Sequence, residues 1–249
     1  MRLRVGFIVA SVLFSLPAIA QEIVAPAPFQ VESEIRDKAI DKWEKAIQEL
    51  EALDLSESHS PDEILMVGSS SVRRWSQIDV DMSPYRVIRR GYGGAKYSDL
   101  AVFADRLIQP HHYRAMVVFV GNDIAGSDDD HSVEQVDRWV RHIIDVSRRH
   151  QPDAPVMIIE VTPTMKRWKQ WPEIRELNAQ LREIALSTPK VYCIDTAEHF
   201  LDSAGQPRTE LFADDNLHLS DQGYDIWANL IRSDLDDVFR LLASESARH

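Results

Sequence analysis

Asp215 and His218 lie three residues apart, a few positions before a long apolar-periodic stretch that starts near Gln222. At this spacing within one turn, the carboxylate can accept a hydrogen bond from the imidazole and fix its tautomer and orientation. A histidine held in this way can remove a proton from a hydroxyl. The pair therefore predicts a general base and its orienting acid, and the nucleophile must come from elsewhere in the chain.

Ser70 is the candidate nucleophile. It follows the apolar run 64–68, where a strand-to-helix turn would project its hydroxyl beside the free backbone N–H groups of a helix N-terminus. On their own, three serines after a strand (69–71) are better explained as a helix cap. The segment also differs from the Gly-x-Ser-x-Gly elbow, because Val72 stands where the second glycine would be.

Two further segments could supply hydrogen-bond donors to a developing oxyanion. The loop 90–96 is rich in glycine, so its backbone amides can approach a ligand closely. It is not a dinucleotide-binding fingerprint, because Lys96 stands at the third glycine position. Asn122 follows the run 115–120 and can aim its side-chain amide into a cleft, although a turn former explains an isolated asparagine there equally well.

The apolar pattern predicts the elements that must position these residues. Short apolar runs with few polar interruptions are typical of strands covered on both faces, as in a parallel sheet. Five such runs occur, at 64–68, 85–88, 115–120, 156–161 and 191–194. Elsewhere the apolar period changes to about 3.6, which predicts helices near 35–50, 133–146, 172–186 and 222–242. The expected fold is a three-layer α/β/α sandwich around a five-stranded parallel sheet.

In open sheets of this kind, the loops that leave the carboxyl ends of the strands converge where the strand order reverses. Ser70, the loop 90–96 and Asn122 each follow an apolar run. We therefore expect them to meet at one rim of the sheet, together with His218 from near the end of the chain.

The order and placement of these segments resemble the SGNH (GDSL-type) hydrolases, and most of all the bacterial branch that is similar to platelet-activating-factor acetylhydrolase. The resemblance spans about residues 62–235. It implies a flavodoxin-like SGNH hydrolase fold. The segments that carry it are Gly68-Ser69-Ser70, Arg90-Gly91-Tyr92-Gly93-Gly94, Asn122-Asp123, Thr162-Pro163 with Arg167-Trp168, Asn178, and Asp215-Asn216-Leu217-His218-Leu219 with Gly223-Tyr224.

The resemblance also implies a role for each matching residue. Ser70 would be the nucleophile, His218 the base and Asp215 its orienter. The Ser70 N–H, the Gly94 N–H and the Asn122 side chain would form the oxyanion hole.

Three positions depart from the family pattern. Ser69 replaces the usual aspartate, Arg89 stands where an asparagine often precedes the glycine loop, and Val120 stands where Gly-x-Asn-Asp has its glycine. The first departure does not touch the mechanism. The other two bear on the shape of the loops and hence on the size of the acyl pocket.

The implied activity is that of a serine esterase that cleaves short acyl esters, O-acetylated glycans or lysolipids through an acyl-enzyme on Ser70. No metal and no organic cofactor is implied. The alternative is a non-catalytic carbohydrate- or lipid-binding module on the same scaffold, which is expected to have lost a member of the triad. Ser70, Asp215 and His218 are all present, which favours the enzyme.

Other chemistry-bearing residues have structural explanations. Cys193 is the only cysteine, which excludes an intramolecular disulfide and a Cys-rich zinc site, and its apolar neighbours predict a buried strand position. The acidic segment 128–131 lacks calcium-loop spacing and is expected to be a solvated lead-in to a helix. His111 is expected in a loop away from the cleft. Trp168 and Trp171 either line a substrate groove or pack against the sheet.

Composition and the N-terminal segment bear on partners and location. Among 249 residues, 28 Lys+Arg stand against 40 Asp+Glu, a formal charge of −12 that argues against nucleic acid as a partner. Residues 1–20 are predicted to be a signal peptide, with Arg2 and Arg4 before an apolar run that ends in Ala18-Ile19-Ala20. That run is too short for a stable membrane anchor. We expect a single hydrolase domain at 21–249, exported to the periplasm or secreted. The sequence pattern favours neither a monomer nor an oligomer.

Overall fold

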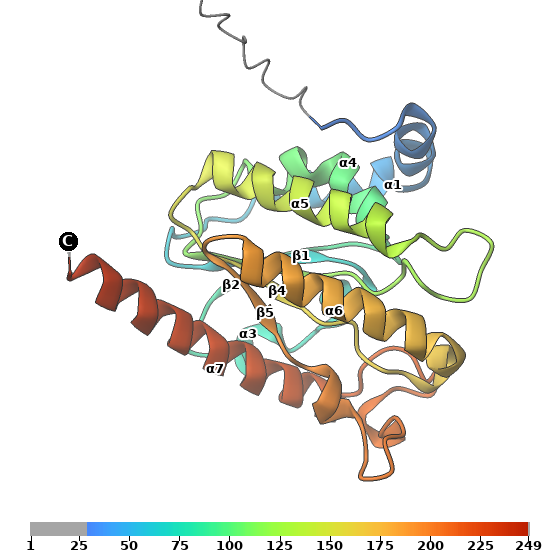
Figure 1. Ribbon diagram of the computed structural model, residues 1–249. Helices are drawn as coiled ribbons and strands as arrows, with labels where there is room; N and C mark the ends of the chain where they lie inside the picture. The colour runs from blue at the N-terminus through green and yellow to red at the C-terminus, as the bar shows by residue number, and fades with distance from the viewer. Residues whose placement is uncertain (1–28, 249) are drawn as a thin grey trace, which may run out of the picture. The chain divides into compact units, whose positions relative to one another are not determined.

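A five-stranded parallel sheet lies at the centre of the computed structural model, which describes residues 29–248 (Figure 1). Its strand order is β2-β1-β3-β4-β5, so the order reverses between β1 and β3, where ligands bind in open sheets of this kind. The signal peptide predicted at 1–20 lies outside the described residues. The strands are β1 (Ile64–Gly68), β2 (Val87–Gly91), β3 (Ala115–Phe119), β4 (Val156–Ile159) and β5 (Val191–Ile194).

Helices cover both faces of this sheet. α4, α5 and α6 lie on one face, with α1 packed against α4, and α2, α3 and α7 lie on the other (Figure 1). The predicted three-layer α/β/α sandwich is confirmed. None of the helices within residues 29–248 combines the length and the apolar character needed to cross a bilayer. The helices are α1 (Ser33–Asp54), α2 (Ser70–Arg74), α3 (Ile78–Asp81), α4 (Tyr97–Ile108), α5 (Val133–His150), α6 (Trp171–Ser187) and α7 (Asp221–Ser246).

The second strand lies further along the chain than predicted. The apolar run 85–88 was expected to form it, whereas β2 runs on through Arg90, a residue that is only 1% exposed. Arg90 donates hydrogen bonds to Asp54 and Glu57, and these carboxylates make its burial possible. Because these carboxylates come from the end of α1 and the segment after it, far from Arg90 in the sequence, no local pattern marks Arg90 as a strand residue. β3 and β4 also end slightly before their predicted limits.

An aromatic core joins α7 to the turn that follows β1. Trp75 stacks on Tyr224 with ring centroids 5.1 Å apart, and Trp227 meets Phe119 of β3 edge-to-face at 4.5 Å. The Tyr224 hydroxyl donates to the backbone oxygen of Ser71 at 2.8 Å. The segment that carries Ser70 and the helix that follows His218 are therefore held on one buried cluster.

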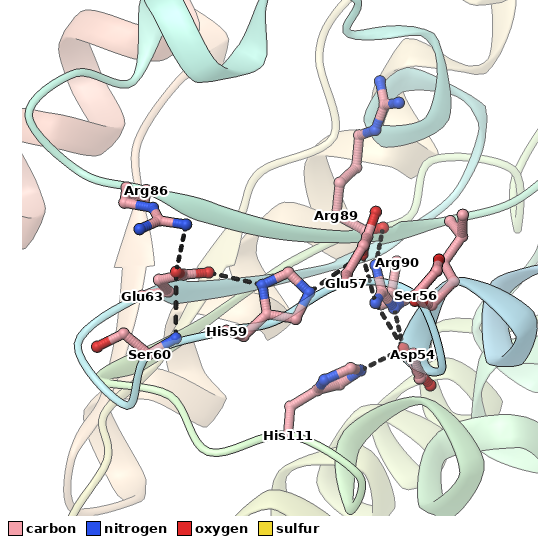
Figure 2. Close-up of polar contacts among 11 residues, drawn as sticks. Asp54, Ser56, Glu57, His59, Ser60, Glu63, Arg86, Arg89, Arg90 and His111 are labelled. Carbon is pink, nitrogen blue, oxygen red and sulfur yellow. Dashed lines mark hydrogen bonds and ion pairs between the residues drawn. The ribbon is translucent and has the colours of Figure 1, made fainter.

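A cluster of charges joins the end of α1 and the segment after it to β2 (Figure 2). Arg90 Nε donates to Asp54 at 2.9 Å and its Nη2 donates to Glu57 at 2.9 Å. His59 lies between two carboxylates, with Nε2 3.1 Å from Glu57 and Nδ1 2.7 Å from Glu63. Since each buried charge has an opposite partner, the cluster fixes the end of α1 against the sheet.

His111 faces the same cluster (Figure 2). It is 4% exposed, and its Nε2 lies 3.4 Å from Asp54 without forming a hydrogen bond to any described residue. The pKa of His111 is lowered to about 4, chiefly by burial; Asp54 and Glu57 oppose the shift, and the nearby Arg90 and His59 add to it. The buried imidazole is therefore neutral near pH 7.

We expect His111 to destabilise the protein as the pH falls from 6.5 toward about 4. In this window the unfolded chain binds a proton at His111 that the folded chain does not, so the free energy of unfolding decreases as the pH decreases. Urea unfolding at about pH 7 and about pH 5 should show a smaller loss of stability for His111→Gln than for the wild type. The exposed neighbour provides a control, His112→Gln, which should keep the wild-type difference. Equal differences in all three proteins would contradict the assignment.

Candidate active site

Ser70 begins α2, just after β1 ends at Gly68. A Cβ on Gly68 would lie 2.0 Å from the backbone oxygen of Phe119 in β3, and the φ of Gly68, +154°, is one that L side chains rarely adopt. Glycine thus permits a close approach in which the Ser69 N–H donates to that same oxygen at 3.0 Å. The turn is pinned to β3 and presents Ser70 at the carboxyl ends of β1 and β3.

The structure brings Ser70 and His218 together across 148 residues of sequence. His218 Nε2 lies 2.9 Å from Ser70 Oγ, and His218 Nδ1 lies 2.6 Å from Asp215 Oδ2. Asp215 Oδ1 accepts hydrogen bonds from the backbone N–H groups of Leu217 and His218 at 3.0 and 2.9 Å. The series carboxylate–imidazole–hydroxyl has the connectivity that activates a serine.

Asp215 is held in its ionised form. Burial alone would raise the pKa of this carboxyl, but hydrogen bonds from the His218 ring and from the backbone of His218 and Leu217 outweigh it and hold the pKa well below the usual range. Asp215 is therefore a permanent acceptor for the imidazole N–H at neutral pH.

A narrow loop carries Asp215 and His218. Its two sides are joined where Phe212 and Leu219 form an antiparallel bridge and where the Ala213 N–H donates to the His218 oxygen at 2.8 Å. Asn216 turns the chain with a φ of 55°, a conformation that asparagine tolerates better than most residues. The closed loop fixes the spacing of acid and base.

Asn122 lies beside this pair. Its Nδ2 donates to the backbone oxygen of Ala95 at 2.9 Å and lies 3.9 Å from the position that a Cβ on Gly94 would occupy. Ser70, Asn122 and His218 line one cavity of about 30 Å³. Gly94 adjoins Asn122 without lining that cavity. The structure therefore places the five predicted site residues in one region, while their catalytic roles remain predictions.

Two contacts that the sequence does not reveal hold the glycine loop in place. The loop backbone at Gly93 packs directly against the Trp43 ring of α1. A Cβ on Gly93, whose φ is +35°, would lie 1.9 Å from that side chain. Beyond the loop, both carboxylate oxygens of buried Asp123 lie 3.1 Å from the Tyr97 N–H at the start of α4. The loop is thus clamped between α1 and the segment after β3.

The family profile described as GDSL-like lipase/acylhydrolase matches residues 66–226, a range that contains Ser70, Asn122, Asp215 and His218. The chain belongs to the GDSL-like lipase/acylhydrolase family. As a member of that family, the protein is an ester hydrolase. The SGNH (GDSL-type) resemblance inferred from the motifs is confirmed.

Known proteins share much of the length of this GDSL-like hydrolase. It is 26% identical over 195 residues to platelet-activating factor acetylhydrolase IB subunit alpha1 of Homo sapiens. The matched region is 75% of this chain and 79% of the human protein. A solved structure from Streptococcus pneumonia matches with a TM-score of 0.69 and 20% identity, covering 81% and 96% of the two chains. A GDSL-like lipase from Bacteroides thetaiotaomicron VPI-5482 matches with a TM-score of 0.65 and 15% identity, covering 77% and 97%. The two structures share the fold.

We expect Asn122→Ala to lower kcat of the hydrolase by about 10²–10³-fold, because one preorganised donor to the oxyanion is lost. Initial rates on p-nitrophenyl acetate measure the effect, and circular dichroism verifies the fold. The exposed asparagine of α7 provides a control, Asn229→Ala, which should keep the wild-type kcat. An unchanged kcat in Asn122→Ala would remove this residue from the site.

The remaining candidates lie outside the catalytic cavity. Burial, with the charge of Asp195, raises the pKa of Cys193 to about 12, so the thiol stays protonated and is a poor nucleophile. Trp168 and Trp171 stack on each other with centroids 6.0 Å apart, half-buried, and neither lines the cavity.

The acidic segment before α5 shapes a loop. Asp130 accepts hydrogen bonds from the backbone N–H groups of Ala125 and Gly126 at 2.8 and 2.6 Å. Ser132 and Gln135 then form the capping box that starts α5. The expected lead-in to a helix is confirmed, although Asp130 is partly buried rather than fully solvated.

Arg167 is the site residue to which the sequence assigned no role. It lies in the 3₁₀ helix η1 (Met165–Gln170), after the carboxyl end of β4, and lines the same cavity as Ser70 and His218. Its guanidinium donates hydrogen bonds to the backbone oxygen of Gly121 and, at 2.5 Å, to Asn122 Oδ1. The only sequence signal was its place after a strand end, within the motif that begins at Thr162-Pro163.

Proposed function

We propose that the protein cleaves carboxylic esters by two-step acyl transfer on Ser70. The observation that carries this proposal is the 2.9 Å contact between Ser70 Oγ and His218 Nε2, backed by the 2.6 Å contact between His218 Nδ1 and Asp215. Membership of the lipase/acylhydrolase family supports the reaction class.

In the first step, Ser70 Oγ attacks the ester carbonyl while His218 Nε2 takes the hydroxyl proton. Asp215 stabilises the imidazolium that forms. The tetrahedral oxyanion accepts hydrogen bonds from the Ser70 N–H, the Gly94 N–H and the Asn122 amide. The carbon–oxygen bond to the alcohol then breaks, and His218 gives its proton to the leaving alkoxide.

The second step repeats this chemistry with water. His218 removes a proton from water, the resulting nucleophile attacks the acyl-enzyme, and the proton returns to Ser70 as the acid leaves. Every proton in the cycle passes through one imidazole, so no metal or organic cofactor is required.

Short acyl groups fit the site best. The cavity at Ser70 has a volume of about 30 Å³, which is room for no more than a few water molecules. An acetyl group therefore suits this space better than a fatty acyl chain. The human relative is named an acetylhydrolase, which supports the same preference. Candidate substrates are simple acetyl esters, O-acetylated glycans and acetylated lysolipids.

Export is part of the proposal. Residues 1–20 carry the arginines, the apolar run and the small-residue cleavage pattern of a signal peptide, with cleavage before Gln21 and one hydrolase domain after it. The enzyme would then act in the periplasm or outside the cell. A non-catalytic binding module on this scaffold is the weaker alternative, because it would have no need of a complete, hydrogen-bonded triad.

A panel of p-nitrophenyl esters from acetate to octanoate tests the substrate preference. We expect kcat/KM to be highest for acetate and to fall as the acyl chain grows, because longer chains exceed the cavity. Acetylated xylan, peptidoglycan and a lysolipid acetyl ester then separate the alcohol classes. A kcat/KM that rises toward octanoate would contradict the short-acyl assignment.

A further inference from the structure

Arg167 places a buried cation beside the catalytic cavity, and none of the residues 29–248 pairs with it as a direct counter-charge. Its guanidinium contacts only the backbone oxygen of Gly121 and Asn122 Oδ1, and within residues 29–248 no carboxylate lies at ion-pair distance from it. Burial lowers the pKa of Arg167, and the more distant Asp130 and Asp123 offset only part of this shift. Burying a cation in this way is unfavourable, and a neutral side chain would fill the space at lower cost.

The partners of Asn122 settle how its carboxamide is oriented. A guanidinium can only donate hydrogen bonds, so the atom that faces Arg167 must be Oδ1. A backbone carbonyl can only accept, so the atom that faces Ala95 must be Nδ2. The two contacts together exclude the flipped amide, in which a donor would meet Arg167 and an acceptor would meet Ala95.

The amide orientation matters for the proposed reaction. Nδ2 has two N–H groups, and its contact with Ala95 uses one of them. In the orientation set by Arg167, the second N–H is left for another acceptor, on an Nδ2 that lies 3.9 Å from the position of a Cβ on Gly94. In the flipped orientation an oxygen would take the place of this Nδ2, and it would repel the negative charge of the tetrahedral intermediate instead of donating to it.

We propose that Arg167 is a positioning residue for the oxyanion hole, which holds the Asn122 amide with its N–H toward the reacting carbonyl. This inference rests on the proposed esterase reaction of Ser70. The same contact to Gly121 fixes the backbone that carries Asn122, so Arg167 acts through Asn122 on the transition state.

A residue that acts in this way affects kcat more than KM, and its effect depends on Asn122. Arg167→Met removes both the charge and the donors. Arg167→Lys keeps an N–H donor for Asn122 Oδ1 but cannot make the two contacts of a planar guanidinium, so it should rescue activity in part. Once Asn122 is alanine, there is no amide left to orient, and the loss of Arg167 should matter much less.

The test measures kcat and KM on p-nitrophenyl acetate, a neutral ester. The proteins compared are the wild type, Ser70→Ala, Arg167→Met, Arg167→Lys, Asn122→Ala and the double variant Arg167→Met/Asn122→Ala. The exposed arginine of α7 provides a matched control, Arg240→Met, which should match the wild type. Thermal unfolding and near-ultraviolet circular dichroism verify that each variant is folded. If Arg167→Met does not fold, Arg167→Lys is compared with the wild type in its place.

We expect Arg167→Met to lower kcat about 10–100-fold while KM stays within about twofold of the wild type. The kcat of Arg167→Lys should lie between those of Arg167→Met and the wild type. The kcat of the double variant should match that of Asn122→Ala within about twofold. A wild-type kcat in Arg167→Met, a change in KM alone, or a full additional loss in the double variant would overturn the inference. If Ser70→Ala hydrolyses the ester as fast as the wild type, or if the wild type does not hydrolyse it, the proposed reaction fails and the inference fails with it. The other results overturn the inference alone.

Discussion

Replacing Ser70 with alanine is expected to lower kcat for p-nitrophenyl acetate by a factor on the order of 10⁵–10⁶. The variant keeps the cavity, Asn122 and His218, but no covalent acyl-enzyme can form. What remains is the contribution of binding and of the oxyanion donors to attack by water. The loss should appear in kcat and kcat/KM alike, and the melting temperature should stay close to that of the wild type because no buried contact of the Oγ besides His218 is removed.

The adjacent serine provides the matched control. Ser71→Ala removes a hydroxyl of the same kind one residue away, and its expected activity is within about tenfold of the wild type. Comparable losses in both variants would mean that the turn, rather than the Ser70 hydroxyl, limits the reaction. A Ser70→Ala variant with substantial activity would rule out Ser70 as the nucleophile.

Asp215→Asn is expected to lower kcat by roughly 10³–10⁴-fold while leaving the loop folded. An asparagine side chain can still accept from the backbone N–H groups of Leu217 and His218. It can also offer an N–H to His218 Nδ1, which would favour the tautomer that carries its proton on Nε2, and that tautomer cannot accept the Ser70 proton. The negative charge that stabilises the imidazolium is lost as well.

Steady-state kinetics of Asp215→Asn beside Asp214→Asn provides the measurement. Asp214 is an exposed carboxylate next in the chain, so its replacement changes the net charge by the same amount without touching His218. Asp214→Asn should retain nearly full activity. Equal activities of the two variants would show that the contact between Asp215 and His218 has no catalytic effect.

The fold could be predicted from sequence wherever burial follows local composition. β1 and β5 have apolar residues throughout and occur at their predicted positions. β2 does not, because Arg90 is polar in the sequence and becomes a buried strand residue only through Asp54 at the end of α1 and Glu57 in the segment after it. A pairing of this kind is tertiary, and a pattern within one segment carries no trace of it.

The candidate site divides in the same way. Ser70, Asn122 and the pair Asp215–His218 could be predicted because each follows a strand end or precedes the last helix, and parallel topology brings such segments to one rim. The roles of Arg167 and Trp43 could not be predicted. Arg167 matters through its contacts with Gly121 and Asn122, and Trp43 through its contact with the glycine loop, so both depend on how distant segments pack.

Covalent labelling of the nucleophile tests the central claim most directly. A fluorophosphonate forms a stable bond with a serine that a neighbouring histidine activates. After incubation and digestion, mass spectrometry should find one adduct per chain, on the peptide that contains Ser70, with labelling abolished in Ser70→Ala and strongly slowed in His218→Gln. An adduct on a different residue, or an unlabelled Ser70 in an enzyme that still hydrolyses esters, would contradict the account.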